Sequence, residues 1–268
     1  MTLSGVSRPP AAFRAGDAVE PPAVIYTQSM QVLDLAAAQL SGTPGVDATG
    51  DFYDVFPVEA GGRNATWWWV VMGDVCGKGM AAASVAASVR HAAHTVAAGA
   101  LEVADGRHAA PDPALLLHRL HDILMVATGR RFVTAVAAVL RPDGHGGLVG
   151  RLASAGHEPA LIRRADGAVD VLTAGGMLLG LVPRRATPAV DVRIGAGETM
   201  VVFTDGVTDA RPGPGSECFG LDRLTDALAA SSGRSVRTVV DAVATAALAY
   251  RDGFLGDDLA VLAVSPSI

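Results

Sequence analysis

Cysteine and lysine are almost absent from this sequence of 268 residues. The two cysteines, Cys76 and Cys218, lie far apart and form no CxxC pair, which argues against a disulfide framework and a structural zinc site. Lys78 is the one lysine among 21 basic residues, and no basic cluster occurs. Because the formal net charge is -6, neither nucleic acid nor an anionic membrane surface is expected as the main partner.

Long hydrophobic runs are also missing. No stretch of about 18 residues is continuously apolar, so no transmembrane helix is expected. The first ten residues, MTLSGVSRPP, lack the charged and apolar regions of a signal peptide, and a cytoplasmic location is therefore expected. Hydrophobic residues make up 50% of the chain, which is ample for a large core.

The chain is predicted to consist of a flexible N-terminal tail, residues 1–22, and a single domain, residues 23–268. Pro, Ala and Gly dominate the tail, and no long polar linker divides the remainder. Apolar residues at helical spacing indicate a helix between Ala23 and Leu40, where the domain begins. Further helices are expected over residues 80–104, 114–127, 221–231 and 235–250.

Strand-like runs are separated by Gly- and Asp-containing turns. Besides a hairpin around residue 62, they cover residues 132–140, 148–155, 160–164, 169–172 and 259–264. The part from 148 to 172 is expected to form a meander. Because the helices come in pairs between groups of strands, regular βαβ alternation is disfavoured. The predicted fold is α+β, with two mainly antiparallel sheets packed face to face and helix pairs outside them.

Four aspartates mark the ends of apolar, strand-like runs. Asp51 opens DFYDVFPV and Asp74 closes WWWVVMGD, and the stretch EAGGRNAT between them is typical of a hairpin turn. Asp205 closes TMVVFTD and Asp257 lies at the start of LAVLAV, so antiparallel pairing of those strands brings the second pair together. All four carboxylates are therefore expected at one edge of the sheets.

Several carboxylates at close range raise one another's pKa unless a cation compensates their charge. A hard divalent ion, Mg²⁺ or Mn²⁺, is the natural partner for such an oxygen-rich pocket. The alternative for any single aspartate is a turn former beside glycine. Asp143 and Asp166 are interpreted in that way.

Other catalytic motifs fit less well. GDVCGKG is too short for a Walker loop and lacks its hydroxyl residue, and no GxSxG elbow occurs. The histidine pairs 91/94 and 118/121 belong to no HExxH motif and are expected to be surface or packing residues. The triplet Trp67 to Trp69 leads into a strand that should be buried, which favours core packing over ligand stacking.

Two further residues are candidates for contacts with a phosphate or a substrate. His157, in SAGHEP, lies in a loop beside a predicted sheet edge and can reach a substrate from there. Lys78 lies in the Gly-rich turn after Asp74, where its charge can meet a phosphate or balance the carboxylates. A solvated turn lysine is an equally good interpretation of Lys78.

Six motifs occur in order: TGDFYDVF, MGDVCGKGMAAA, FVTAVAAVL, ASAGHEPALI, FTDGVTDA and GDDLAVLAV. Together they resemble the motif series of the PPM-type, metal-dependent protein serine/threonine phosphatases, in the bacterial branch typified by SpoIIE and RsbU. The resemblance runs from about Asp47 to Val264. It implies an αββα sandwich with two Mn²⁺ or Mg²⁺ ions at the rim of the sheets.

The resemblance also implies roles for individual residues. Asp74 bridges both metals, Asp51 holds one of them, and Asp205 and Asp257 hold the other. The backbone carbonyl of Val75 completes a metal shell. Neighbouring aspartates are candidates for orienting metal-bound waters; these are Asp54, Asp209 and Asp258.

The sequence departs from the family pattern at two informative places. Thr49 stands where relatives usually have a second glycine before GDFYD. Cys76 lies at or near the position where eukaryotic members carry a histidine that protonates the leaving group, so the leaving-group acid is unassigned.

The implied function is hydrolysis of phosphoserine or phosphothreonine by a water activated by two metals. The implied substrate is a phosphoprotein, an anti-sigma factor antagonist in bacterial partner-switching control of sigma factors. Two alternatives stay open, a catalytically weak binding or regulatory module and a hydrolase of small phosphate esters. The sequence also leaves open whether the chain forms a homodimer or binds a regulatory partner.

Overall fold

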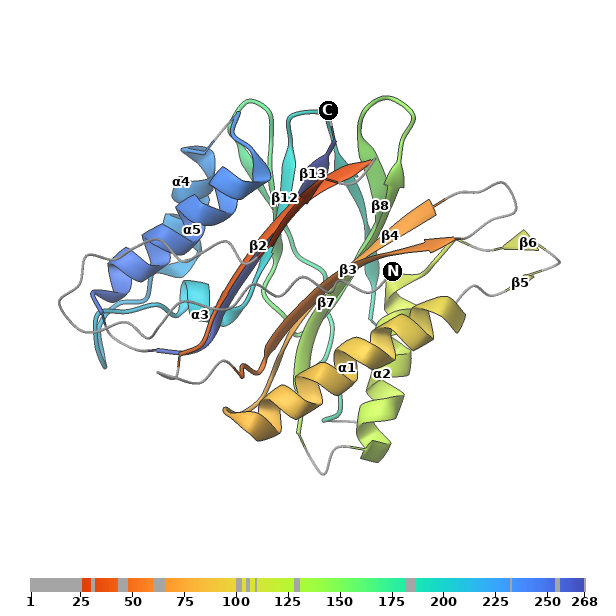
Figure 1. Cartoon of the computed structure of the whole chain (residues 1–268), viewed down its shortest axis with the longest axis horizontal. Coiled ribbons are helices and arrows are strands. Elements are labelled where there is room, and N and C mark those ends of the chain that lie inside the picture. The colour runs from red at the N-terminus through yellow and green to blue at the C-terminus, as the bar shows by residue number, and fades with distance from the viewer. Residues whose placement is uncertain are drawn as a thin grey trace.

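Two antiparallel sheets stacked face to face form the centre of the computed structural model (Figure 1). The structure describes residues 26–29, 32–42, 48–59, 66–99, 103–104, 107–108, 110–127, 131–181, 187–231, 233–253 and 256–267. The predicted tail, residues 1–22, lies outside them. A short two-stranded sheet joins β5 (Val103–Ala104) to β6 (Arg107–His108).

The larger sheet has six strands and contains both ends of the described chain. Its order is β1 (Tyr26–Ser29), β2 (Leu33–Leu40), β13 (Leu259–Pro266), β12 (Thr199–Phe203), β9 (Ala160–Arg163) and β10 (Val169–Leu172). The second sheet has the order β11 (Ala189–Ile194), β8 (Leu148–Ala155), β7 (Val133–Pro142), β4 (Thr66–Val75) and β3 (Asp51–Glu59). Every pairing in both sheets is antiparallel.

Two helices cover the outer face of each sheet (Figure 1). The five-stranded sheet packs against α1 (Met80–Gly99) and α2 (Pro113–Ala127). The six-stranded sheet packs against α4 (Gly220–Ala229) and α5 (Val236–Arg251), next to the short α3 (Asp205–Thr208). The predicted four-layer arrangement of helix pairs around two sheets is confirmed. None of the helices in the described ranges combines the length and apolar character needed to cross a membrane.

Strand alternation builds three hydrophobic cores from these layers. Val70 and Met72 of β4 pack between the sheets with Leu262 of β13, whereas Trp69 and Val71 face α1 and α2. A third core lies under α4 and α5. Trp69 is completely buried, which confirms core packing for that member of the tryptophan triplet.

The helix expected between Ala23 and Leu40 is wrong, because the described part of that segment forms β1 and β2. Leu33 and Leu35 of β2 face the core between the sheets, while Ala36 and Ala38 face the helices. Since both faces of the strand are buried over residues 35–38, the run LAAA there is continuously apolar and lacks the alternation typical of a half-exposed strand.

The meander expected from residue 148 to residue 172 is wrong at one connection. Strand β8 belongs to the five-stranded sheet and β9 to the six-stranded sheet, so the segment Gly156 to Pro159 crosses from one sheet to the other. A turn signal shows that the chain reverses but not which sheet it joins. Strand β11 and helix α3 were not expected.

Candidate metal centre

The hairpin of β3 and β4 places Asp51 directly opposite Asp74, as the sequence predicted. The next strand, β7, sets Thr134 opposite Asp74. Asp51 belongs to the strand face that points toward the other sheet, together with Val55. The five-stranded sheet thus contributes two adjacent carboxylates at one end.

The six-stranded sheet contributes the other pair. Asp205 follows β12 and Asp257 precedes β13, and these strands pair antiparallel with Phe203 opposite Val261. Gly206 permits the close packing of α3 on this edge, because a Cβ there would collide with the backbone carbonyl of Asp258. All four predicted carboxylates therefore converge where the ends of the two sheets meet.

The pKa values of these carboxyl groups are raised. Burial, together with the charges of Asp205, Asp257 and Asp258, raises the pKa of Asp74 to about 6. Burial likewise raises the pKa of Asp205, with contributions from the charges of Asp257 and Asp209. The pocket is thus strongly negative, and ionisation of one carboxyl group makes ionisation of its neighbours less favourable.

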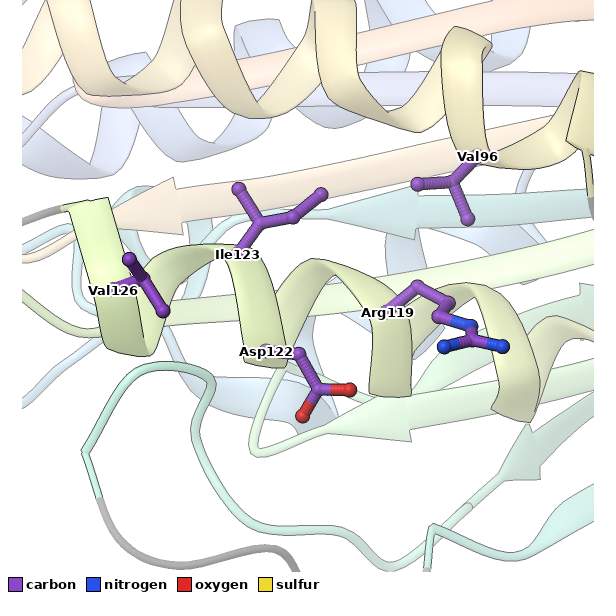
Figure 2. A pocket seen from close by; sticks show the side chains of 5 residues that line it. All are labelled: Val96, Arg119, Asp122, Ile123 and Val126. Atoms are coloured by element: carbon purple, nitrogen blue, oxygen red, sulfur yellow. The ribbon is translucent and has the colours of Figure 1, made fainter.

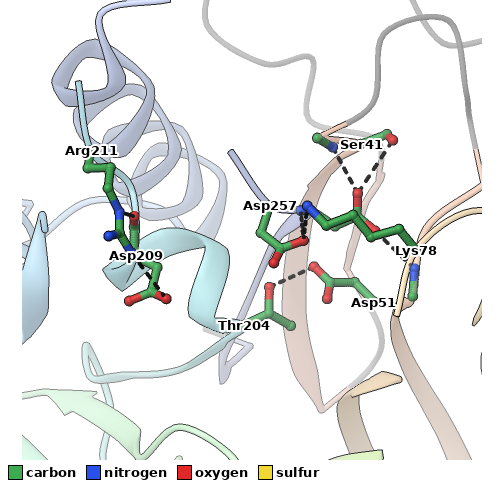
Figure 3. A network of polar contacts seen from close by, with 10 residues as sticks. Ser41, Asp51, Lys78, Thr204, Asp209, Arg211 and Asp257 are labelled. Atoms are coloured by element: carbon green, nitrogen blue, oxygen red, sulfur yellow. Dashed lines mark hydrogen bonds and ion pairs between the residues drawn. The ribbon is translucent and has the colours of Figure 1, made fainter. Parts of the chain in front are cut away.

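Asp51 is the most buried of the four, at 4% exposure. Burial raises the pKa of Asp51 well above its ordinary value, although a hydrogen bond from Thr204 opposes this effect. The Thr204 hydroxyl donates to Asp51 Oδ2 at 2.7 Å and accepts from the Ala260 N–H at 2.9 Å (Figure 3). Thr204, at the edge of the six-stranded sheet, therefore fixes the position of a carboxylate that belongs to the five-stranded sheet.

A second polar network joins the two sheets at Asp51. Gln39 of β2 donates to the Thr49 hydroxyl at 2.6 Å and to the backbone carbonyl of Asp51 at 2.8 Å. The Thr49 hydroxyl also donates to that carbonyl at 2.9 Å. The threonine found in place of the family's glycine thus supplies a hydroxyl that ties β3 to β2.

Asp258 organises the backbone behind the site. Its carboxylate accepts hydrogen bonds from the backbone N–H groups of Gly42 at 2.8 Å and Gly50 at 3.0 Å. Gly50 lies against the carbonyl of Val75 and Asp74 Oδ1, where a Cβ would stand 2.9 Å and 3.1 Å from those oxygens. Asp258 therefore positions the segment that passes beside two predicted metal ligands.

The Gly-rich loop after Asp74 brings Lys78 to the carboxylates. Lys78 Nζ lies 3.2 Å from Asp257 Oδ1 (Figure 3), and its charge lowers the pKa of Asp205. Arg131, which the sequence did not single out, donates to the carbonyl of Cys76 at 2.9 Å. Gly77 adopts φ +110 beneath this arginine, and a Cβ there would meet the guanidinium at 2.5 Å.

His157 lies on the crossover between the sheets. Its Nδ1 shares a hydrogen bond with the Thr134 hydroxyl at 2.9 Å, so it sits one strand beyond Asp74. Burial lowers the pKa of His157 to about 4, partly offset by an interaction with the backbone of Phe203. The imidazole is therefore neutral at physiological pH.

Two of the aspartates expected to orient waters are bound to other groups. Asp54, three residues after Asp51, faces α1, where its carboxylate contacts His94 at 2.8 Å and Arg90 at 3.9 Å. Asp209 follows α3 and pairs with Arg211 at 3.7 Å (Figure 3). The third candidate, Asp258, accepts a hydrogen bond from the N–H of Gly50, the residue before Asp51.

Two charged residues near the site were missed. Burial raises the pKa of Glu158, and so do the charges of Asp205 and Asp209, which places this residue beside the cluster. Arg251, the buried last residue of α5, packs against Gly256 just before Asp257. No local sequence pattern marks either residue, although Glu158 adjoins the motif residue His157.

Within the described residues, no three acidic, histidine or cysteine side chains already form a ligand set for a metal. Asp51 is directed to Thr204 and Asp257 to Lys78 instead. A separate groove of about 490 Å³ lies between α1 and α2, lined by Val96, Arg119, Asp122, Ile123 and Val126 (Figure 2). None of the four predicted carboxylates lines that groove.

The model of the family described as Stage II sporulation protein E (SpoIIE) matches residues 64–266. The chain belongs to this family. This SpoIIE-family chain is 33% identical over 112 residues to protein IcfG of Synechocystis, a match that covers 41% of the chain and 17% of IcfG. The resemblance to PPM-type phosphatases of the SpoIIE and RsbU branch is thereby confirmed.

Solved structures support the fold of the SpoIIE-family chain. The PP2C phosphatase domain of Bacillus subtilis SpoIIE, with a fragment of its regulatory domain, has a TM-score of 0.71 at 15% identity, covering 88% of this chain and 62% of that one. The RsbU and RsbW domains of a Mycobacterium tuberculosis protein have a TM-score of 0.65 at 21% identity, covering 88% and 60%. The chain thus spans less than two thirds of each of these relatives.

Proposed function

We propose that residues 23–268 form one PPM-type domain that hydrolyses phosphoserine or phosphothreonine with the help of two divalent cations, Mn²⁺ or Mg²⁺. The observation that carries this proposal is the convergence of Asp51 and Asp74 from one sheet with Asp205 and Asp257 from the other. The family match adds support, since its solved relatives include phosphatase domains.

The donor set suits hard divalent cations. It consists of carboxylate oxygens whose pKa values are raised by burial and by their mutual repulsion, and a cation of higher charge than Lys78 relieves that repulsion. Asp74 would bridge the two ions, Asp51 would hold one, and Asp205 and Asp257 would hold the other, with the Val75 carbonyl as a further ligand. When bound, the ions supply an acidified water and neutralise charge on the phosphoryl group.

The chain's own residues would prepare this site and position the substrate. Thr204 holds Asp51 in one orientation through its short hydrogen bond. Asp258 fixes the backbone at Gly50, next to the Val75 carbonyl. Lys78, released from Asp257 when a cation takes its place, would offer its ammonium group to a phosphoryl oxygen. His157, being neutral, would accept or donate a hydrogen bond without adding charge.

The proposed substrate is a phosphorylated anti-sigma factor antagonist in a partner-switching system. This follows the resemblance to the RsbU branch, and one solved relative carries RsbU and RsbW domains in the same protein. Lys78 and Asp257 are about half-exposed at this edge, and an open site suits a protein substrate better than an enclosed pocket would.

Metal-dependent turnover is the direct test. The purified chain is assayed with Mn²⁺ or Mg²⁺ on p-nitrophenyl phosphate and on a phosphoserine peptide, with Asp74→Asn and Asp205→Asn alongside. Titration calorimetry with Mn²⁺ gives a readout independent of turnover. We expect both variants to lose metal binding and hydrolysis together.

Three other outcomes would contradict parts of the proposal. Mn²⁺ binding without turnover on any phosphoprotein would indicate a binding module. Turnover of the small ester, but of no phosphopeptide or phosphoprotein, would indicate a hydrolase of small phosphate esters. Full activity in either variant would remove that aspartate from the metal site.

A further inference from the structure

A second groove lies on the outer face of the five-stranded sheet, at the end remote from the carboxylates. Its volume is about 430 Å³, within the range of small-molecule sites. We call it the arginine groove, after three of its lining residues: Arg141, Arg151 and Arg193. Trp67 and Asp191 also line it.

Strand register explains why these side chains share one face. Val149 of β8 lies opposite Arg141 of β7 on one side and Arg193 of β11 on the other. Two residues further along β8, Arg151 lies between Val139 and Asp191 in the same way. Since alternate residues of a strand point to the same side of a sheet, the three arginines face one way.

Trp67 of β4 lies at the end of the cross-strand row formed by Arg141, Val149 and Arg193. Its neighbour Trp68 pairs with Leu140, so Trp67 lies across from Arg141, and the Arg141 guanidinium stands 5.4 Å from the centre of the Trp67 ring. Trp67 is half-buried, whereas Trp69 is buried completely. Trp67 thus packs against the same core as Trp69 but also lines the groove.

The groove brings three guanidinium groups together on one face of an acidic protein. One carboxylate, Asp191, lines the groove with them, and two more lie close by: Asp112 pairs with Arg151, and Asp143 interacts electrostatically with Arg193. The ion pair of Arg151 with Asp112 is long, at 3.5 Å, and about half-exposed. Such a pair contributes little to stability, so its loss on ligand binding would cost little free energy.

These groups suit a ligand with a planar ring at one end and an anion at the other. An indole and a guanidinium both stack on planar rings, and arginine forks bind phosphate oxygens with two parallel hydrogen bonds. Three strand spacings of about 4.8 Å separate Trp67 from Arg193, roughly 14 Å in all. That span leaves room for a ring and a phosphate group side by side along one row.

We propose that the arginine groove binds a nucleotide, with its base against the Trp67 and Arg141 pair and its phosphates at Arg151 and Arg193. The site is distinct from the carboxylates, because Trp67 and Asp74 are seven residues apart on one strand, roughly 23 Å. The proposal does not depend on phosphatase activity.

Binding of ATP and GTP to the full chain tests this proposal. The measurement is titration calorimetry with tryptophan fluorescence, in EDTA and with Asp74→Asn as host, so that phosphates do not bind through metal ions at the carboxylates. We expect the double variant Arg151→Ala/Arg193→Ala to weaken binding at least tenfold, and Trp67→Leu to weaken it and abolish the fluorescence change. Trp67→Phe should retain binding, and Arg237→Ala, an exposed arginine on α5, is the matched control.

Four results would overturn the proposal. The first two are no binding of either nucleotide at millimolar concentration and unchanged affinity in the double arginine variant. The third is equal affinity for pyrophosphate or for the nucleoside alone. The fourth is binding of an acidic peptide without any binding of nucleotides. The last result would show a docking surface for protein instead. Unchanged thermal unfolding of the arginine variants confirms that any loss is local.

Discussion

The two ends of the five-stranded sheet carry opposite charges in different surroundings. At one end Asp51 and Asp74 are largely buried, and both burial and the charges of carboxylates from the other sheet raise the pKa of each. At the other end Arg141 and Arg193 are exposed to solvent. Buried charges of one sign are strongly coupled, whereas exposed charges are screened by water. Substitutions should therefore have large effects at the carboxylate end and small ones at the arginine end.

The largest difference is expected between two Asp→Asn substitutions. Asp74→Asn removes the carboxylate proposed to bridge the cations, and we expect the rate of phosphopeptide hydrolysis to fall by at least ~100-fold. Asp191→Asn makes the same chemical change at the exposed end and should leave the rate within about twofold, since no cation site lies there. Steady-state kinetics in Mn²⁺ measure both, and equal losses would contradict the assignment of the two ends.

Thr204→Val is expected to have the next largest effect. Valine has nearly the same shape but leaves the Ala260 N–H and Asp51 without their hydroxyl partner, which should lower the free energy of unfolding by about 1–3 kcal/mol. Thr204→Ser keeps the hydroxyl and should recover most of that loss. Urea denaturation compares the three proteins, and a valine variant as stable as the wild type would show that the buried hydroxyl contributes nothing.

A smaller effect is expected from pH in the metal-free protein. The folded pKa of Asp74 is about 6, above its ordinary value of 3.8, so the folded state binds more protons than the unfolded state between these values. Stability should therefore fall, by about 1–2 kcal/mol after allowance for partial exposure, as pH rises from about 4 to 7. Asp74→Asn should flatten this dependence in thermal unfolding experiments performed in EDTA.

Addition of Mn²⁺ provides the converse measurement. A bound cation favours ionised carboxylates, so the wild type should gain stability on metal addition most strongly above pH 6. A gain in melting temperature that is equal at pH 5 and pH 7.5 would show that the carboxylates do not titrate with the metal.

The smallest effect is expected from Arg151→Ala. Its pair with Asp112 is exposed and 3.5 Å long, so the free energy of unfolding should change by less than about 0.5 kcal/mol. Urea denaturation at low and high salt checks this value. A loss above 1 kcal/mol would mean that the arginine groove is part of the structural core after all.

Local patterns were enough to place the four strand-end aspartates. The hairpin turn and the two apolar runs determine that Asp51 opposes Asp74, and the register confirms it. Strand alternation predicts that Asp54 and Asp51, three residues apart, point to opposite faces of the sheet. The family resemblance instead made Asp54 a candidate for orienting metal-bound waters. The structure instead binds Asp54 to α1.

The supporting contacts were beyond prediction from local patterns. Thr204 and Asp51 are 153 residues apart, and their hydrogen bond exists because two sheets pack at a particular offset. The same applies to Gln39, whose strand was mistaken for a helix because both its faces are buried. Trp67 and Trp68 pack against the cores as predicted, but nothing in a triplet of tryptophans shows that both are only partly buried.

The place of β13 in the six-stranded sheet has a consequence for synthesis of the chain. This strand lies between β2 and β12, although residues 259–266 are made after every other strand. Until they leave the ribosome, β2 has a vacant edge, and Asp257 and Asp258 are missing from the site. The five-stranded half can therefore form before residues 259–266 are made, whereas the carboxylate cluster receives Asp257 and Asp258 only together with β13.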